Sequence, residues 1–190
     1  DRGALDAAVT RLVERHQVLR SRFSATEGQP IQIVEPARTW VVHCVDLRGL
    51  PAEQREQATA QQLRQSSAAA FDLQSGPMLR TELIQLEDEL HLLVVTFHHI
   101  VVDGWSMLVF FKELGELYRR AIAGSQSALP SLPIQYSDYA VWQRNWMTGP
   151  VLEKELSYWR TALAGAPMTL ELPLDRPRPR SKSYSAAASR

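Results

Sequence analysis

Two adjacent histidines, His98 and His99, follow an apolar run in the stretch TFHHIVVDGWSM at residues 96–107, and Asp103 and Gly104 come shortly after them. The apolar run predicts a strand, and side chains alternate along a strand, so we expect the two rings on opposite faces. One ring could then face a cavity while the other supports the backbone. A helix that begins just beyond Gly104 would direct amide N–H groups back toward this corner. The pattern favours a neutral imidazole that acts as a base, with Asp103 organising the corner.

The same residue types allow two other chemistries. His99 and Asp103 are four residues apart, a metal-ligand spacing on a helix, but the preceding strand and Gly104 argue against a helix there. Ser106 could be the nucleophile of a Ser-His-Asp hydrolase, but GWSML lacks the second glycine of the usual Gly-x-Ser-x-Gly elbow. Either histidine could also be a hydrogen-bonded core residue without a catalytic role.

Composition narrows the class of protein. The chain has 190 residues, of which 45% are hydrophobic and 22% charged, values typical of a globular protein. Lys plus Arg equals Asp plus Glu, 21 each, so we expect neither a nucleic-acid nor a membrane partner. The single cysteine, Cys44, excludes an internal disulfide and a cysteine-rich zinc site. These features predict a cytoplasmic protein without a bound metal.

Hydrophobic periodicity predicts helices that pack on a mixed sheet, an α/β (α+β) fold. The run 92–95 is apolar on both faces, which predicts a central, covered strand. The expected helices are 4–18, 51–71, 105–124, 137–147 and 152–165; the expected strands lie within 19–36, around a turn at 28–30, and at 39–47, 79–86 and 90–99.

The stretch HHIVVDGWS, residues 98–106, resembles the HHxxxDG signature of condensation domains of nonribosomal peptide synthetases, members of the chloramphenicol acetyltransferase-like superfamily. Four further segments resemble the family in the same order: RHQVLRSRF (15–23), FDLQSGPMLR (71–80), YSDYAVWQR (136–144) and YWRTALAGAPMTLELPLDRPRP (158–179). The resemblance covers essentially the whole chain. It implies a chloramphenicol acetyltransferase-like two-layer sandwich of a mixed sheet and helices, one half of a pseudo-dimeric domain.

The resemblance also implies a domain organisation and a reaction. Residues 1–174 are expected to be the N-terminal half of a condensation domain, and residues 175–190 a crossover or linker toward its C-terminal half. The implied reaction is amide-bond formation between a donor aminoacyl or peptidyl thioester and an acceptor aminoacyl thioester. Two alternatives stay open: a stand-alone acyl-coenzyme A-dependent acyltransferase of the same superfamily, and an epimerisation-type domain.

The implied partners are the upstream and downstream peptidyl carrier domains, an adjacent adenylation domain and the C-terminal half of the same domain. The substrates would be carried on the 4'-phosphopantetheine of the carriers, with no cofactor bound directly. We expect the isolated fragment to be inactive.

The resemblance assigns roles to the motif residues. His99 is expected to be the general base or the group that positions the amine, and His98 to support the backbone. Gly104 is expected to meet a conformational need and to offer its backbone N–H to the oxyanion.

Asp103 is expected to form a structural ion pair with an arginine rather than to move protons. Arg15 is the first candidate partner and Arg20 the second, because the family's second segment lies close to the motif.

Overall fold

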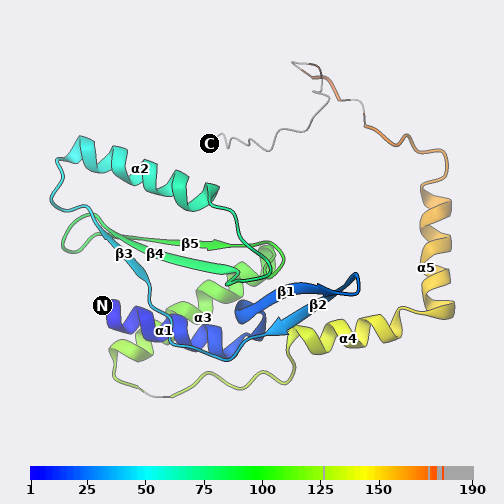
Figure 1. Cartoon of the computed structure of the whole chain (residues 1–190), viewed down its shortest axis with the longest axis horizontal. Helices are drawn as coiled ribbons and strands as arrows, with labels where there is room; N and C mark the ends of the chain where they lie inside the picture. The colour runs from blue at the N-terminus through cyan, green and yellow to red at the C-terminus, as the bar shows by residue number, and fades with distance from the viewer. Residues whose placement is uncertain (126, 171, 175–176, 178–190) are drawn as a thin grey trace. The chain divides into compact units, whose positions relative to one another are not determined.

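The computed structural model of the chain describes residues 1–125, 127–170, 172–174 and 177 (Figure 1). The chain divides into two compact units, Asp1–Gln143 and Arg144–Arg190. The crossover predicted at 175–190 lies outside the described residues, apart from Pro177. Every residue of the double-histidine motif lies in the first unit.

The observed elements confirm the predicted α/β class and the predicted order of helices and strands. They are α1 (Arg2–Arg15), η1 (Gln17–Arg20), β1 (Ser21–Thr26), β2 (Gln29–Val34), β3 (His43–Asp46), α2 (Ala52–Ala68), β4 (Leu79–Gln85), β5 (His91–Phe97), α3 (Gly104–Ile122), α4 (Tyr136–Trp146) and α5 (Gly149–Ala162).

The strands form two separate sheets among the described residues. β1 and β2 make an antiparallel hairpin whose turn lies at Glu27 and Gly28, one residue earlier than predicted, and both residues have positive φ. β3 pairs parallel with β4, and β4 pairs antiparallel with β5, so the three-stranded sheet has the order β3-β4-β5.

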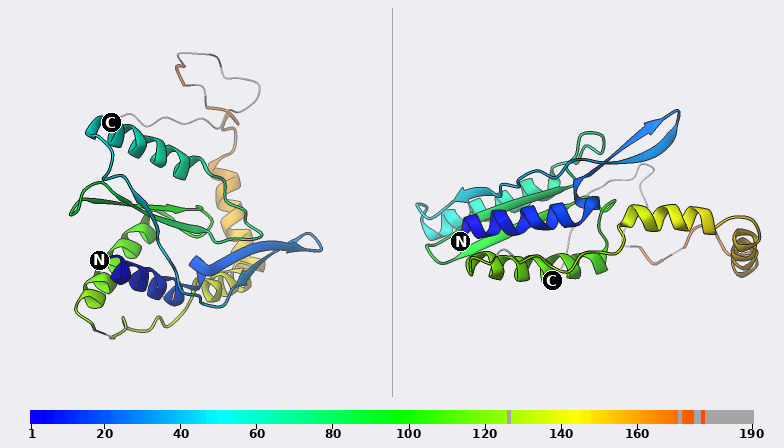
Figure 2. Two further views of the ribbon diagram at one scale, coloured as in Figure 1. Left: turned by 60° about the vertical axis from the view of Figure 1, so that its left-hand side comes forward. Right: turned by 90° about the horizontal axis from the view of Figure 1, so that it is seen from below.

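The prediction that residues 92–95 form a central strand is wrong for this sheet, because β4 is central and β5 lies at its edge. The apolar character of β5 on both faces has another cause. One face of the sheet packs on α1 and α3, and α2 lies over the other face (Figures 1 and 2). A strand that is covered on both faces has an apolar sequence along its whole length, whether it lies at the centre or at the edge of the sheet.

The hydrophobic core lies between the sheet and the pair α1 and α3. Asp1 begins α1 as its N-cap, since its carboxylate accepts a hydrogen bond from the backbone N–H of Ala4 at 2.8 Å. Helix α1 buries one apolar stripe, which consists of Leu5, Ala8, Val9, Leu12 and Val13. It meets the buried side chains of α3 and β4: Phe110, Leu114, Leu117 and Leu79.

Helix α2 lies on the sheet through polar contacts, and none of its residues is buried. Gln62 and Ser66 donate hydrogen bonds to the carboxylate of Glu82 on β4 at 2.7 and 2.8 Å. The large apolar cluster of this unit lies on the α1 and α3 side of the sheet, whereas Ile84, two residues from Glu82 on β4, is fully buried on the α2 side.

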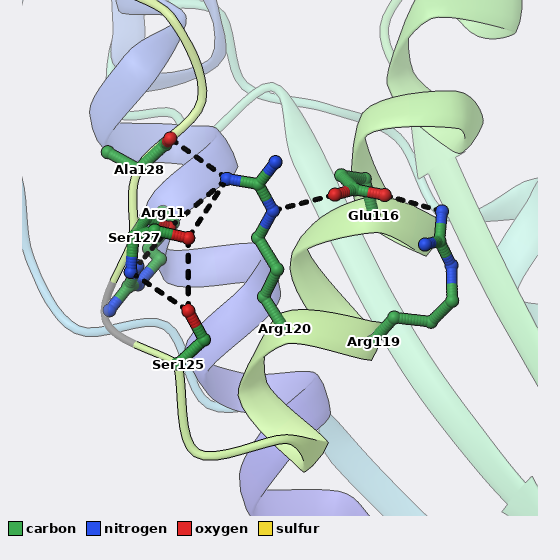
Figure 3. A network of polar contacts seen from close by, with 7 residues as sticks. All are labelled: Arg11, Glu116, Arg119, Arg120, Ser125, Ser127 and Ala128. Carbon is green, nitrogen blue, oxygen red and sulfur yellow. Dashed lines mark hydrogen bonds and ion pairs between the residues drawn. The ribbon is translucent and has the colours of Figure 1, made fainter.

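The segment that follows α3 is tied to α3 and α1 by charged side chains (Figure 3). Arg120 donates to Glu116 at 2.7 Å and to the carbonyl of Ala128 at 2.9 Å, and Arg11 of α1 donates to the carbonyl of Ser127 at 3.4 Å. The hydrogen bond from Arg120 holds the pKa of Glu116 below its ordinary value. These bonds fix the route by which the chain returns toward α4.

The second unit contains α5, which follows Thr148 as its N-cap residue. Trp159 of α5 is 55% exposed, and its ring meets that of Tyr158 edge to face, with 5.3 Å between the centroids. Of the helices that the structure describes, none combines the length and the apolar composition needed to span a bilayer.

Candidate functional site

The double-histidine loop connects the end of β5 to the start of α3. The backbone N–H of His98 donates to the carbonyl of Met78 at 3.0 Å, which extends the β4 and β5 pairing one residue beyond Phe97. The backbone N–H of Val101 then donates to the carbonyl of His98 at 3.1 Å, and the Val101 side chain is buried. The loop is thus anchored on both sides of the histidine pair.

The ring of His98 is engaged within the loop. Its Nδ1 lies 3.0 Å from the backbone nitrogen of Ile100. Because a backbone N–H can only donate, Nδ1 is the acceptor, and a neutral ring carries its proton on Nε2. The ring also makes an edge contact with Phe71, with 5.9 Å between centroids and 85° between planes. This geometry supports the backbone-supporting role predicted for His98, which stays a prediction.

His99 is exposed, and within the described part of the chain its ring has no hydrogen-bonding or ionic partner. Both ring nitrogens are therefore accessible to a reactant. An imidazole in this condition can accept a proton from an amine or hold the amine by a hydrogen bond. The role predicted for His99 requires this accessibility.

Asp103 is the N-cap of α3. Its carboxylate accepts hydrogen bonds from the backbone N–H of Ser106 at 2.8 Å and from the Ser106 hydroxyl, and the backbone N–H of Asp103 donates to the Ser106 hydroxyl oxygen at 3.1 Å. This is a capping box, which satisfies the first donors of the helix. The Ser106 hydroxyl and then its backbone N–H hold the pKa of Asp103 below its ordinary value. The Ser106 hydroxyl is directed to Asp103 rather than to a histidine.

The ion pair expected between Asp103 and Arg15 or Arg20 is not formed, so this prediction is wrong. Arg15 donates through Nε to both oxygens of Glu113, at 3.1 and 3.2 Å, and Arg20 donates to the backbone carbonyl of Glu35 at 2.5 Å. The cause is local geometry. The short Asp103 side chain turns to the N-terminus of its own helix, whereas Glu113 lies farther along α3, where that helix packs against α1.

Glu113 was missed by the sequence analysis. Besides Arg15, its carboxylate meets Nε2 of His16 at 2.7 Å, and its side chain is 17% exposed. A signal for it exists in the sequence. Position 113 falls at i+3 from Phe110 and i−4 from Leu117, on the buried stripe of α3. A carboxylate on an apolar stripe requires a partner, which predicts a cation facing it.

Gly104 is the first residue of α3, and its backbone does not have the positive φ that would require glycine. A Cβ added there would meet no atom within 4 Å. The conformational need predicted for Gly104 is therefore wrong. Its backbone N–H is one of the first-turn donors of the helix, so the oxyanion contact stays a prediction.

A cavity of ≈ 360 Å³ adjoins the motif on the α3 side. Its walls are mostly apolar, and Asp103, Ser106 and His16 line it together with Val101, Trp105 and Ile134. His99 does not line it, so this cavity and the face of His99 are separate features of the site. Among the described residues, no three side chains of His, Cys, Asp or Glu gather closely enough to hold a metal ion.

The mixed sheet with its helices, and the double-histidine loop that leads from a strand into a helix, agree with the chloramphenicol acetyltransferase-like fold of the solved domains that the chain resembles. The whole chain, residues 1–190, matches the family described as "Condensation domain", and the chain belongs to that family.

The relatives agree with this assignment. The chain is 43% identical over 181 residues to malpinin synthetase of Mortierella alpina, a match that covers 95% of this chain and 2% of that protein. It resembles the X-domain from teicoplanin biosynthesis with a TM-score of 0.82 and 30% identity, over 94% of this chain and 39% of the other. The epimerization domain from the third module of tyrocidine synthetase B gives a TM-score of 0.75 and 28% identity, over 92% and 39%. The chain thus spans well under half of the proteins it matches.

Proposed function

We propose that this chain is the N-terminal half of a condensation domain that forms amide bonds in nonribosomal peptide synthesis. The observation that carries the proposal is the exposed ring of His99, without a partner among the described residues, in an intact HHIVVDG loop of a chain that matches the family over its entire length. The proposed partners are upstream and downstream peptidyl carrier domains, an adjacent adenylation domain and the C-terminal half of the same domain. The single cysteine and the balanced charge support a cytoplasmic location as part of this proposal.

The proposed reaction requires only a small catalytic contribution from the protein. The neutral amine of the acceptor attacks the thioester carbonyl of the donor, a C–N bond forms, and the C–S bond breaks as the oxyanion collapses. The amine proton leaves through His99 and ends on the sulfur of the donor phosphopantetheine. A positioned base and a held amine account for such a step without a metal ion.

The test is His99→Ala in the full-length protein, with both carriers loaded. Dipeptide formation should fall by ~10²-fold or more, the usual scale for the loss of a positioned acid-base group. Carrier loading should be unchanged. His91→Ala is the matched control, because His91 is an exposed histidine at the other end of β5. Condensation at a near wild-type rate in His99→Ala would remove this residue from the mechanism.

The same assay separates the two alternatives. The epimerization domain of tyrocidine synthetase B has a similar structure and a different reaction in its name. Inversion of a carrier-bound residue without amide formation would identify an epimerisation-type domain. Turnover with an acyl-coenzyme A donor and no donor carrier would identify a stand-alone acyltransferase.

A further inference from the structure

We propose that Arg80 and Phe71 are positioning residues for the double-histidine loop and that they act through the ring of His98. The inference rests on the proposed function. The guanidinium carbon of Arg80 lies 3.8 Å from the centroid of the Phe71 ring, and the Phe71 ring meets the His98 ring edge to face at 5.9 Å. The three side chains form one continuous stack, from β4 to the end of β5.

The strand register explains why these side chains meet. Arg80 lies opposite Thr96, and the hydrogen bond from His98 to Met78 continues the same register by one more pair. Residues that face each other across an antiparallel pair share a face of the sheet, as do residues two apart along a strand. Arg80 and His98 therefore lie on one face, and Phe71, from the segment that precedes β4, lies between them.

The Arg80 end of the stack is itself fixed. Nη2 of Arg80 donates to the backbone carbonyl of Ala69 at 2.5 Å. Nε of Arg80 is buried and has no hydrogen-bond partner among the described residues. The orientation of the guanidinium is therefore determined by one carbonyl and by the face of Phe71. A cation on the face of an aromatic ring is attracted to the negative charge of that face, and the attraction increases when water is excluded.

The stack matters because His99 has no side-chain partner of its own within the described residues. The position of its ring is therefore set by the backbone around it. The neighbouring residue, His98, is the one whose ring is held, by Ile100 on one side and by Phe71 on the other. A turn of the His98 ring away from Phe71 would also free the N–H of Ile100 and displace the peptide that carries His99.

The kinetic test uses the full-length protein with loaded carriers. We expect Phe71→Leu and Arg80→Gln to lower kcat by about 10- to 100-fold, the scale for a reacting group displaced by about 1 Å, with KM for the carriers unchanged. Phe71→Tyr should retain activity because it keeps the ring. Arg80→Lys should rescue part of it, because it keeps the cation but loses the planar stack.

Arg55→Gln is the matched control. Arg55 also donates from its guanidinium to a backbone carbonyl, that of Leu86 at 2.8 Å, but it contacts neither Phe71 nor His98. Its substitution should leave kcat at the wild-type value. An equal loss of kcat in Arg55→Gln and Arg80→Gln would overturn the proposal, because general loosening of the sheet would then explain both.

A second readout does not depend on turnover. NMR of the full-length protein with ¹³C-labelled histidine reports on the His98 ring, whose resonance is assigned from its loss in His98→Gln. The chemical shift of this resonance should change in Phe71→Leu and in Arg80→Gln. It should stay the same in Arg55→Gln. An unmoved His98 resonance would overturn the stack, and a moved resonance with normal kcat would overturn the positioning role. If Arg80→Gln does not fold, Phe71→Leu decides the matter by the same two readouts. Failure of the proposed function would appear instead as normal condensation in His99→Ala.

Discussion

The pairing of Arg15 with Glu113, in place of the pairing with Asp103 expected from the sequence, can be tested by a double-mutant cycle. The perturbations are Arg15→Met and Glu113→Gln, singly and together. Arg15 donates through Nε to both Glu113 oxygens, and the two side chains are 16% and 17% exposed. His16 contributes a further contact to the same carboxylate.

The expected magnitude follows from these distances. Unit charges about 4 Å apart interact with about 4 kcal/mol at an effective dielectric constant of ~20, which is an upper bound for a pair that water reaches in part. Hydrogen bonds to charged groups contribute about 1.5–3 kcal/mol. We therefore expect Glu113→Gln to lower the free energy of unfolding by about 1.5–3 kcal/mol, with a coupling energy to Arg15→Met of about 1–2 kcal/mol.

Urea denaturation followed by tryptophan fluorescence measures these values. Glu14→Gln serves as the control, because Glu14 is an exposed carboxylate on α1 and its substitution should change stability by less than about 0.5 kcal/mol. The parallel cycle with Arg15→Met and Asp103→Asn should be additive. Strong coupling of Arg15 to Asp103, with additivity at Glu113, would refute the arrangement described here.

Three further predictions concern the core, the helix cap and the fragment. Leu12 is fully buried, so Leu12→Ala should lower the free energy of unfolding, measured by urea denaturation, by about 2–5 kcal/mol. Leu63→Ala, on the exposed side of α2, should lower it only slightly. Similar losses in the two variants would contradict the assigned core. The pKa of Asp103 in the folded chain lies below its ordinary value of 3.8. The charged carboxylate therefore makes its full contribution to the free energy of unfolding above that pH, and this contribution is lost as the pH falls below it. Denaturation midpoints of Asp103→Asn should therefore lie below those of wild type at neutral pH and converge with them in acid; a constant gap would argue against the charged cap. Residues 1–190 alone should show no condensation with loaded carriers, and the C-terminal half added in trans should restore some; robust turnover by the chain alone would contradict the two-half organisation.

The local structure could be predicted from the sequence because its causes are local. The stripe from Leu5 to Val13 repeats with the period of a helix, and this alone predicts both α1 and its buried face. The hairpin of β4 and β5 follows from two apolar runs that flank a charged turn. The loop between β5 and α3, with its two histidines and an aspartate before a helix, is likewise a property of consecutive residues.

The contacts between distant segments could not be predicted in the same way. Arg15 and Glu113 are 98 residues apart, and their meeting depends on how α1 packs against α3. The resemblance pointed to Asp103 because that residue belongs to the motif, but the side chain of Asp103 satisfies its own helix. The stack of Arg80, Phe71 and His98 likewise depends on the β4 and β5 register and on the path of the segment before β4.

The sequence by itself therefore determined the class of fold, the order of the elements and the residues that could do chemistry, because periodicity and motif spacing act over a few residues. Only the tertiary structure decided which carboxylate holds Arg15, which strand is central and, among the described residues, which of the two histidines is left without a partner. Each of these depends on distances between elements far apart in the chain. Such distances are set when apolar faces pack, and a linear pattern contains no measure of them.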